Sequence, residues 1–100
     1  MSYSLLIRPE AEADLAEARL WYEQRREGLG ADFLLCVEEA LQRVCRSPEV
    51  YPRVHKDVRR AFVHRFPYGV FYRVVRDQVV VIGVVHGRRR PRYWQSRPES

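Results

Sequence analysis

The clearest pattern in the chain is a stripe of apolar residues at helical spacing between positions 33 and 44. Neighbouring members lie mostly three or four residues apart, and polar residues occupy many positions between them, as expected for a helix that packs one side against a core. The stripe consists of Phe33, Cys36, Val37, Ala40, Leu41 and Val44. Ser47 precedes Pro48, and a residue before proline disfavours the helical region, so we expect the helix to end there.

Another helix is predicted upstream, from about Pro9 to Arg26. Proline at the first helical position and carboxylates in the first turn are helix-start signals, and apolar residues from Leu15 to Tyr22 keep helical spacing. Gly28 and Gly30 then interrupt the pattern, which indicates a short turn and an antiparallel helical hairpin. The segment before the hairpin, Tyr3–Arg8, has the pattern of a short strand.

The second half of the chain changes to a period of two residues, which indicates strands. Pro67-Tyr68-Gly69 and Arg76-Asp77-Gln78 are predicted connections, and a last turn or short strand is expected over Arg92–Arg97. The predicted strands are Val58–Phe66, Val70–Val75 and Val79–His86, the last of which is rich in β-branched residues, as central strands are.

These elements predict an α+β fold in the order β-α-α-β-β-β. The helical hairpin packs its apolar stripes on one face of an antiparallel sheet of about four strands. The length of 100 residues fits a single domain spanning residues 1–100. The longest apolar run, Val79–Val85 with Gly83 inside it, is far shorter than the ~20 residues of a membrane helix, so no membrane association is expected.

Cysteine content gives little further information. Cys36 and Cys45 lie nine residues apart on one predicted helix, or about 13 Å along its axis, which is too far for a disulfide. No histidine accompanies them at zinc spacing, so neither a metal site nor a cofactor is expected. The N-terminus lacks the pattern of a secretory signal, and two reduced thiols favour a cytoplasmic location.

The net charge of +5 hides a strong asymmetry between the two halves of the chain. Residues 1–50 contain six Lys/Arg and ten Asp/Glu, a net charge of −4, whereas residues 51–100 contain twelve and three, a net charge of +9. Such a basic half suggests an acidic or polyanionic partner, although a solvated basic face without function has the same composition.

No phosphate-binding loop, dinucleotide fingerprint, nucleophile elbow or zinc-protease motif occurs in the sequence. What remains is a set of basic and aromatic residues that neighbouring antiparallel strands and the tail bring close together. Such residues suit phosphate contacts with base stacking, and equally suit a protein interface, because Arg, Tyr and Trp are common anchors there. The candidate binding residues are Arg59, Arg60, Arg65, Arg73, Arg88, Arg89, Arg90, Arg92, Tyr93 and Trp94.

Metal-free RNA cleavage is one chemistry that this set permits. It requires a base, an acid and a cation for the phosphate. His64 or His86 would transfer protons near neutral pH, Arg89 would hold the phosphate, and Tyr72 is a further catalytic candidate. Each has a plainer alternative: His86 bonded to backbone, His64 on the surface, and Tyr72 in the core.

Taken together, the motifs resemble the RelE/ParE superfamily of bacterial toxins from type II toxin–antitoxin modules, over nearly the whole chain. Each is weak alone, and their order and spacing make the resemblance specific. They are Ala13-Asp14-Leu15 with Trp21-Tyr22, Gly28-Leu29-Gly30-Ala31-Asp32-Phe33, Pro48-Glu49-Val50-Tyr51-Pro52, Arg59-Arg60, Phe66-Pro67-Tyr68, Tyr72-Arg73-Val74 and His86-Gly87-Arg88-Arg89-Arg90-Pro91-Arg92-Tyr93-Trp94. The family fold, two helices on an antiparallel sheet, agrees with the one predicted above.

The resemblance implies a toxin neutralised by a small cognate antitoxin that folds on it and contacts operator DNA. RelE-like members cut mRNA on the ribosome, whereas ParE-like members inhibit DNA gyrase. Arg89 matches the RelE arginine after the last strand, but Gly69 falls where RelE has a basic residue, and Arg59 and Arg60 replace its lysines only loosely. The His86–Trp94 ending looks more ParE-like, so gyrase inhibition is the favoured function and ribosome-dependent mRNA cleavage the alternative.

Overall fold

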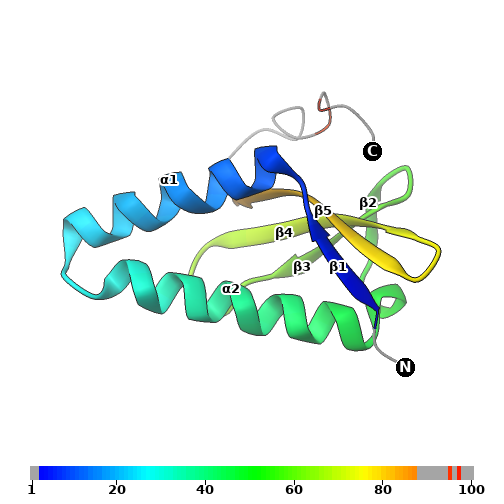
Figure 1. Cartoon of the computed structure of the whole chain (residues 1–100), viewed down its shortest axis with the longest axis horizontal. Coiled ribbons are helices and arrows are strands. Elements are labelled where there is room, and N and C mark those ends of the chain that lie inside the picture. Colours follow the sequence, from blue (N-terminus) through cyan, green and yellow to red (C-terminus); the bar gives the residue numbers. More distant parts are fainter. Residues whose placement is uncertain (1–2, 88–94, 96, 98–100) are drawn as a thin grey trace.

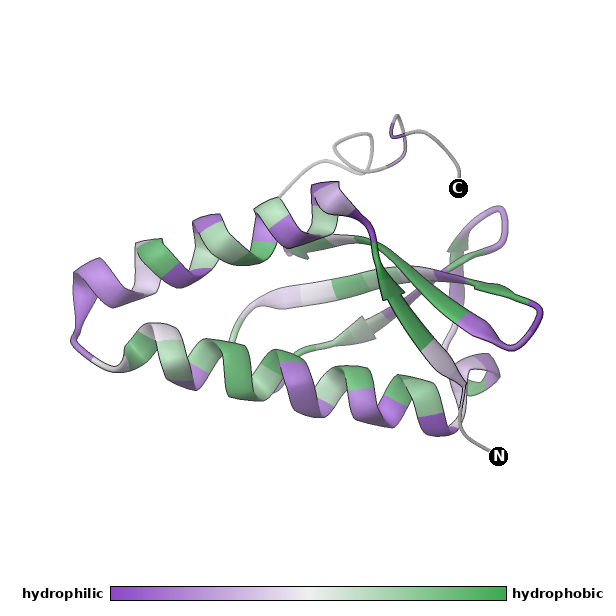
Figure 2. Cartoon of the chain, viewed as in Figure 1, coloured by the Kyte–Doolittle hydropathy of each residue, from purple (hydrophilic) through white to green (hydrophobic). Residues whose placement is uncertain are grey.

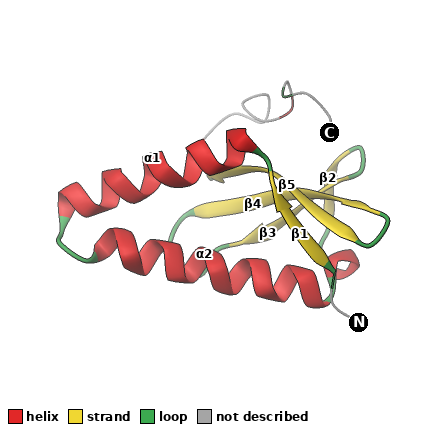
Figure 3. Cartoon of the chain, viewed as in Figure 1, coloured by secondary structure: helices red, strands yellow, loops and turns green. Residues whose placement is uncertain are grey.

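The computed structural model describes residues 3–87, 95 and 97. Two helices form one layer and a five-stranded sheet forms the other, as the red and yellow elements of Figure 3 show. The elements along the chain are β1 (Ser4–Ile7), α1 (Pro9–Arg25), α2 (Leu29–Arg46), the 3-10 turn η1 (Pro48–Val50), β2 (Arg53–His55), β3 (Val58–Phe62), β4 (Tyr68–Val75) and β5 (Gln78–His86).

The predicted α+β class and the helical hairpin are confirmed, with three differences in the sheet. A short strand, β2, was not foreseen, and the strand predicted over Val58–Phe66 ends at Phe62. The sheet is mixed rather than antiparallel, because β1 pairs with β5 in parallel, Ser4 opposite Gln78. The strand order is β1-β5-β4-β3-β2, so the first and last strands of the chain are neighbours (Figure 1).

The helical hairpin is held together by a close approach at its turn. Glu23 accepts hydrogen bonds from the backbone N–H groups of Gly28 and Gly30, both at 3.0 Å. Gly28 has a φ of +89°, which favours glycine. A Cβ at Gly30 would lie 2.7 Å from the carbonyl oxygen of Arg19, so only glycine lets the two helices come this close.

The main core lies between the helices and the sheet. Every residue of the predicted stripe on α2 is buried there, and Tyr22 of α1 stacks on Phe33. Trp21, which precedes Tyr22 on α1, is 48% exposed and has the Arg25 guanidinium over its ring. Figure 2 shows hydrophobic colour concentrated along the strands and hydrophilic colour at the β4–β5 turn.

A second, smaller core lies on the sheet face that the helices do not cover. Its buried members are Val58, Phe71, Val80, Ile82 and Val85. Successive strand residues point to opposite faces, so this face carries the alternate residues of β3, β4 and β5. Apolar side chains on both faces explain why β5 contains an almost continuous apolar run.

A β-bulge interrupts the pairing of β4 with β5. Phe71 lies opposite Gly83 and Tyr72 opposite Val81, so Ile82 has no partner residue on β4. The carbonyl oxygen of Ile82 accepts a hydrogen bond from Arg97 at 2.8 Å, and the N–H of Val84 donates to Asp14 at 3.0 Å. A bulge re-aims backbone groups, and here side chains from α1 and the tail satisfy them.

Candidate functional site

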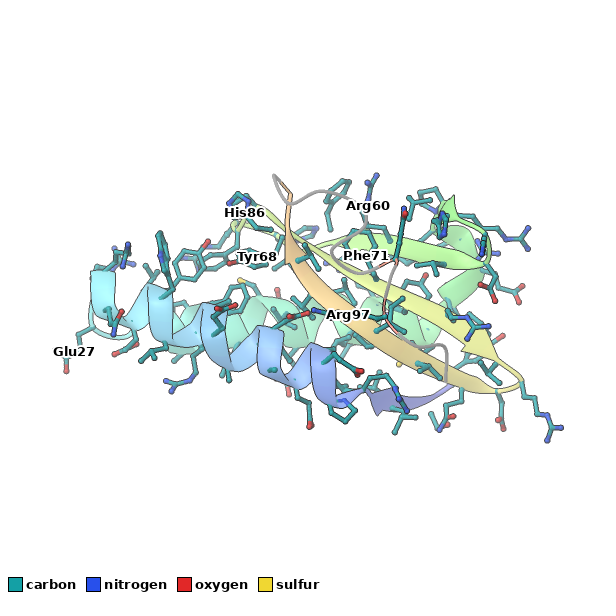
Figure 4. The ribbon with its side chains drawn as sticks, turned by 90° about the horizontal axis from the view of Figure 1, so that it is seen from above. Glu27, Arg60, Tyr68, Phe71, His86 and Arg97 are labelled. Carbon is teal, nitrogen blue, oxygen red and sulfur yellow. The ribbon has the colours of Figure 1, made fainter. Side chains whose placement is uncertain are left out.

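Arg59 and Arg60 are adjacent on β3 and therefore point to opposite faces of the sheet. Nη1 of Arg59 donates hydrogen bonds to the carbonyl oxygens of Glu49 and Tyr51, at 3.0 and 2.6 Å. This arginine thus fastens the segment around η1 to the sheet. Arg60 lies opposite Phe71 in the β3–β4 pairing and shares its face, as Figure 4 shows.

Arg60 and Phe62 form a small surface on the helix-free face, which we call the Arg60–Phe62 patch. The guanidinium carbon of Arg60 lies 4.4 Å from the centroid of the Phe62 ring, and Phe62 is 60% exposed. The Nε atom of Arg60 is buried, and within the described residues it has no hydrogen-bond acceptor. The patch therefore combines an exposed aromatic ring with a cation whose hydrogen-bonding capacity the described residues do not use.

Gly69 gives the Arg60 side chain its space. It lies opposite Phe62 on the neighbouring strand, and a Cβ at this position would meet Cγ and Cδ of Arg60 at 3.2 Å and the Phe71 ring at 3.3 Å. The position where a RelE-like basic residue was expected therefore lies against the stem of Arg60. In this chain the positive charge of that region comes from β3.

Two further candidate arginines are held by acidic residues of the same chain. Arg73 binds Asp57 through Nε and Nη2, at 3.1 and 2.9 Å to the same carboxylate oxygen, and these hydrogen bonds lower the pKa of Asp57. Arg65 lies 3.8 Å from Asp32, in a backbone conformation with φ of +72°. Both arginines therefore have local structural roles beside any role in binding.

Tyr72 lies in the main core and is fully buried. Its hydroxyl donates a 2.6 Å hydrogen bond to the carbonyl oxygen of Pro48, and burial raises the pKa of this hydroxyl well above its usual range. A phenol that is shielded from solvent and already bonded to backbone is poorly placed for proton transfer to a substrate. The plainer alternative, a core tyrosine, is the one that the geometry matches.

Of the two histidine candidates, His86 lies on the helix side of the sheet, away from the Arg60–Phe62 patch. His86 ends β5 opposite Tyr68, with the ring centroids 5.3 Å apart, and Tyr68 packs against the main core on the helix side (Figure 4). His64 lies exposed in the turn between β3 and β4. The structure thus places Arg60 and His86 on different faces of the sheet. Arg88, Arg89, Arg90, Arg92, Tyr93 and Trp94 lie outside the described residues.

A buried ion pair between Asp14 of α1 and Arg97 of the tail was not predicted from the sequence. Asp14 is 7% exposed, and its two carboxylate oxygens accept hydrogen bonds from Nη1 and Nη2 of Arg97, at 2.9 and 3.0 Å. A signal was present in the sequence: Asp14 falls on the inward stripe of α1, with Ala11 and Ala18. A carboxylate in such a position requires a buried partner.

Over residues 3–87, 95 and 97, no three His, Cys, Asp or Glu side chains gather as metal ligands. In the same part of the chain, neither helix has the length and apolar character needed to cross a membrane. Cys36 and Cys45 are free thiols, and burial raises the pKa of Cys45.

The fold is shared with chains from toxin–antitoxin systems of known structure. A chain from the chromosomal ParDE system of Pseudomonas aeruginosa superposes with a TM-score of 0.73 at 18% identity, covering 85% of this chain and 96% of that one. A chain of the RelBE2 toxin–antitoxin complex from Mycobacterium tuberculosis gives a TM-score of 0.59 at 23% identity, covering 86% and 99%. At these identities the likeness establishes the fold.

Sequence comparison gives the family. No curated protein matches the chain. The family described as ParE toxin of type II toxin-antitoxin system, parDE, matches residues 5–91, which include both helices and the sheet except for Ser4. The chain therefore belongs to the ParE toxin family of type II toxin–antitoxin systems.

Proposed function

We propose that this toxin inhibits DNA gyrase by direct protein–protein contact, without an enzymatic site of its own. The observation that carries the proposal is the Arg60–Phe62 patch, where a buried Nε atom without an acceptor among the described residues lies beside an exposed aromatic ring. Arginine and aromatic residues dominate the energetics of protein interfaces.

The placement of the other candidates supports an interface over a nuclease site. RNA cleavage needs a base, an acid and a phosphate-binding cation around a single phosphate. Here Tyr72 is fully buried and its hydroxyl already donates to the carbonyl oxygen of Pro48, whereas Arg60 lies beside an exposed aromatic ring. The basic segment Arg88–Trp94 would extend the target contact in this proposal.

A supercoiling assay with purified toxin and gyrase tests the proposal. We expect inhibition by the natural chain and a loss of about tenfold or more in potency for Arg60→Ala and for Phe62→Ala. Arg53→Ala is the matched control, because Arg53 is an exposed arginine on the neighbouring strand β2. Far-ultraviolet circular dichroism shows whether each variant is folded.

Two results would overturn the proposal. Gyrase that supercoils normally at micromolar toxin would exclude the target. New mRNA ends in a translating-ribosome assay, lost in Arg89→Ala, would establish the RelE-like activity in its place.

We further propose that a cognate antitoxin covers the Arg60–Phe62 patch and neutralises the toxin. An acidic antitoxin segment would suit the net charge of +9 on residues 51–100, and contact with operator DNA would then occur through the antitoxin. Co-expression with the short reading frame beside the toxin gene should restore growth and give a stable complex. Unaffected growth when the toxin is induced alone would contradict this proposal.

A further inference from the structure

A pocket of about 300 Å³ lies between α1 and the end of β5, on the helix side of the sheet. It is separate from the Arg60–Phe62 patch, which lies on the opposite face. Its lining includes three aromatic rings, an imidazole and a carboxylate that faces solvent: Trp21, Tyr22, Tyr68, His86 and Glu17. We call it the aromatic pocket.

The rings of the aromatic pocket form a continuous wall. The ring centroids of Trp21 and Tyr22 are 5.0 Å apart, those of Tyr22 and Tyr68 are 6.1 Å apart, and those of Tyr68 and His86 are 5.3 Å apart. Figure 4 shows Tyr68 and His86 next to each other at the end of the sheet. The negative faces of aromatic rings attract cations.

The wall of this pocket already binds a guanidinium from the chain itself. Asp14, which lines the pocket, holds Arg97 through two hydrogen bonds, and Arg97 also donates to the carbonyl oxygen of Ile82. Both carboxylate oxygens of Asp14 therefore already accept hydrogen bonds from Arg97. Glu17 lies one turn further along α1, is exposed, and has no ion pair or hydrogen bond to its side chain within the described residues.

We propose that the aromatic pocket binds the side chain of an arginine presented by a protein partner. The guanidinium would pair with the Glu17 carboxylate and lie against the ring of Tyr68, since the Trp21 ring already has the Arg25 guanidinium over it. Charge favours this occupant, because the pocket is lined by the carboxylates of Asp14 and Glu17, and Asp14 is already paired with Arg97. The inference goes beyond gyrase inhibition, since binding of a basic side chain here can be measured without gyrase.

Titration of the full-length toxin with N-acetyl-arginine amide, followed by amide and indole chemical shifts, tests the proposal. Saturable shifts are expected at Glu17, at His86 and at the indole N–H of Trp21. N-acetyl-glutamate amide should leave these signals in place. Equal shifts with neutral N-acetyl-phenylalanine amide would overturn the proposal, because the pocket would then select apolar groups and not a cation.

Variants on α1 give the matched comparison. Glu17→Gln removes the carboxylate of the pocket with little change in shape, and we expect it to weaken binding of the arginine probe about fivefold. Glu12→Gln removes the same charge from an exposed position of α1 outside the pocket and should have no such effect. Equal affinities for Glu17→Gln and the natural chain, or no localised shifts with the arginine probe, would refute the inference.

Discussion

The buried pair of Asp14 and Arg97 offers the sharpest test of how the tail is joined to the fold. Within the described residues Asp14 accepts three hydrogen bonds, two from Arg97 and one from the N–H of Val84, and the side chains of Asp14 and Arg97 are 7% and 15% exposed. The substitution Arg97→Ala leaves a buried carboxylate with one donor of three. It also leaves the carbonyl oxygen of Ile82, at the β-bulge, without the hydrogen bond from Arg97.

The expected loss in the free energy of unfolding for Arg97→Ala follows from this geometry. Removing one partner of a buried ion pair costs about 3–5 kcal/mol, and we expect about 3 kcal/mol because Arg97 keeps some contact with water. With a urea m-value of about 2 kcal/mol per M for a small domain, the unfolding midpoint should fall by about 1.5 M. Arg97→Lys keeps the positive charge but cannot form the bidentate hydrogen bonds to Asp14, so we expect an intermediate loss in the free energy of unfolding.

Urea unfolding followed by circular dichroism measures these effects. Arg46→Ala is the control, since Arg46 is an exposed arginine at the end of α2 and should change stability by less than about 0.5 kcal/mol. A double-mutant cycle with Asp14→Asn isolates the interaction. A loss below about 1 kcal/mol for Arg97→Ala, or additive effects of the two substitutions, would refute the reasoning.

Three further predictions concern single side chains. Tyr72→Phe should lower the free energy of unfolding in urea by about 1 kcal/mol. Because burial raises the pKa of Tyr72, the stability that this residue contributes is complete below the ordinary tyrosine pKa of about 10 and is lost as pH rises above it. The variant should therefore lose less stability at alkaline pH than the natural chain. Gly30→Ala should lower the melting temperature, at a cost of about 1–3 kcal/mol, because its Cβ would meet the Arg19 carbonyl oxygen at 2.7 Å. The hydrogen bonds from Arg73 lower the pKa of Asp57, so the stability that they contribute is present above the ordinary carboxyl pKa and disappears as pH falls through the lowered value. Asp57→Asn should therefore make the free energy of unfolding less dependent on pH in acid. The change should be less than about 1 kcal/mol, since Asp57 is largely exposed. An unchanged pH profile or melting temperature in the respective variant would contradict each prediction.

Hydrophobic periodicity, together with proline, glycine and carboxylate signals at the helix ends, was sufficient for the helices and for most of the sheet. The predicted Pro9–Arg26 helix is observed as Pro9–Arg25, and the stripe on α2 is buried residue for residue. A helix with one apolar face buries that face against the core. The local pattern of the segment therefore determines both that it is a helix and which side of it faces the core. The resemblance to RelE/ParE toxins also rested on local motifs, and the family match over residues 5–91 confirms it.

The candidate site could be predicted only in part. The sequence indicated that basic and aromatic residues come together on neighbouring strands, but not which of them already have partners in the chain. Arg59 binds backbone carbonyl groups and Arg73 binds Asp57, whereas Nε of Arg60 has no acceptor among the described residues. Adjacent positions on one strand differ in this way because alternate side chains face different surroundings.

By itself, then, the sequence determined the elements, the fold class, the toxin family and the charge asymmetry, all of which depend on local pattern and composition. Tertiary structure decided what depends on contacts between distant segments. It placed β1 parallel to β5, buried the hydroxyl of Tyr72 against Pro48, and joined Asp14 to Arg97 across 83 positions of sequence. The free energy of a hydrogen bond or an ion pair depends on burial and on its partner, and neither is defined until the chain is folded.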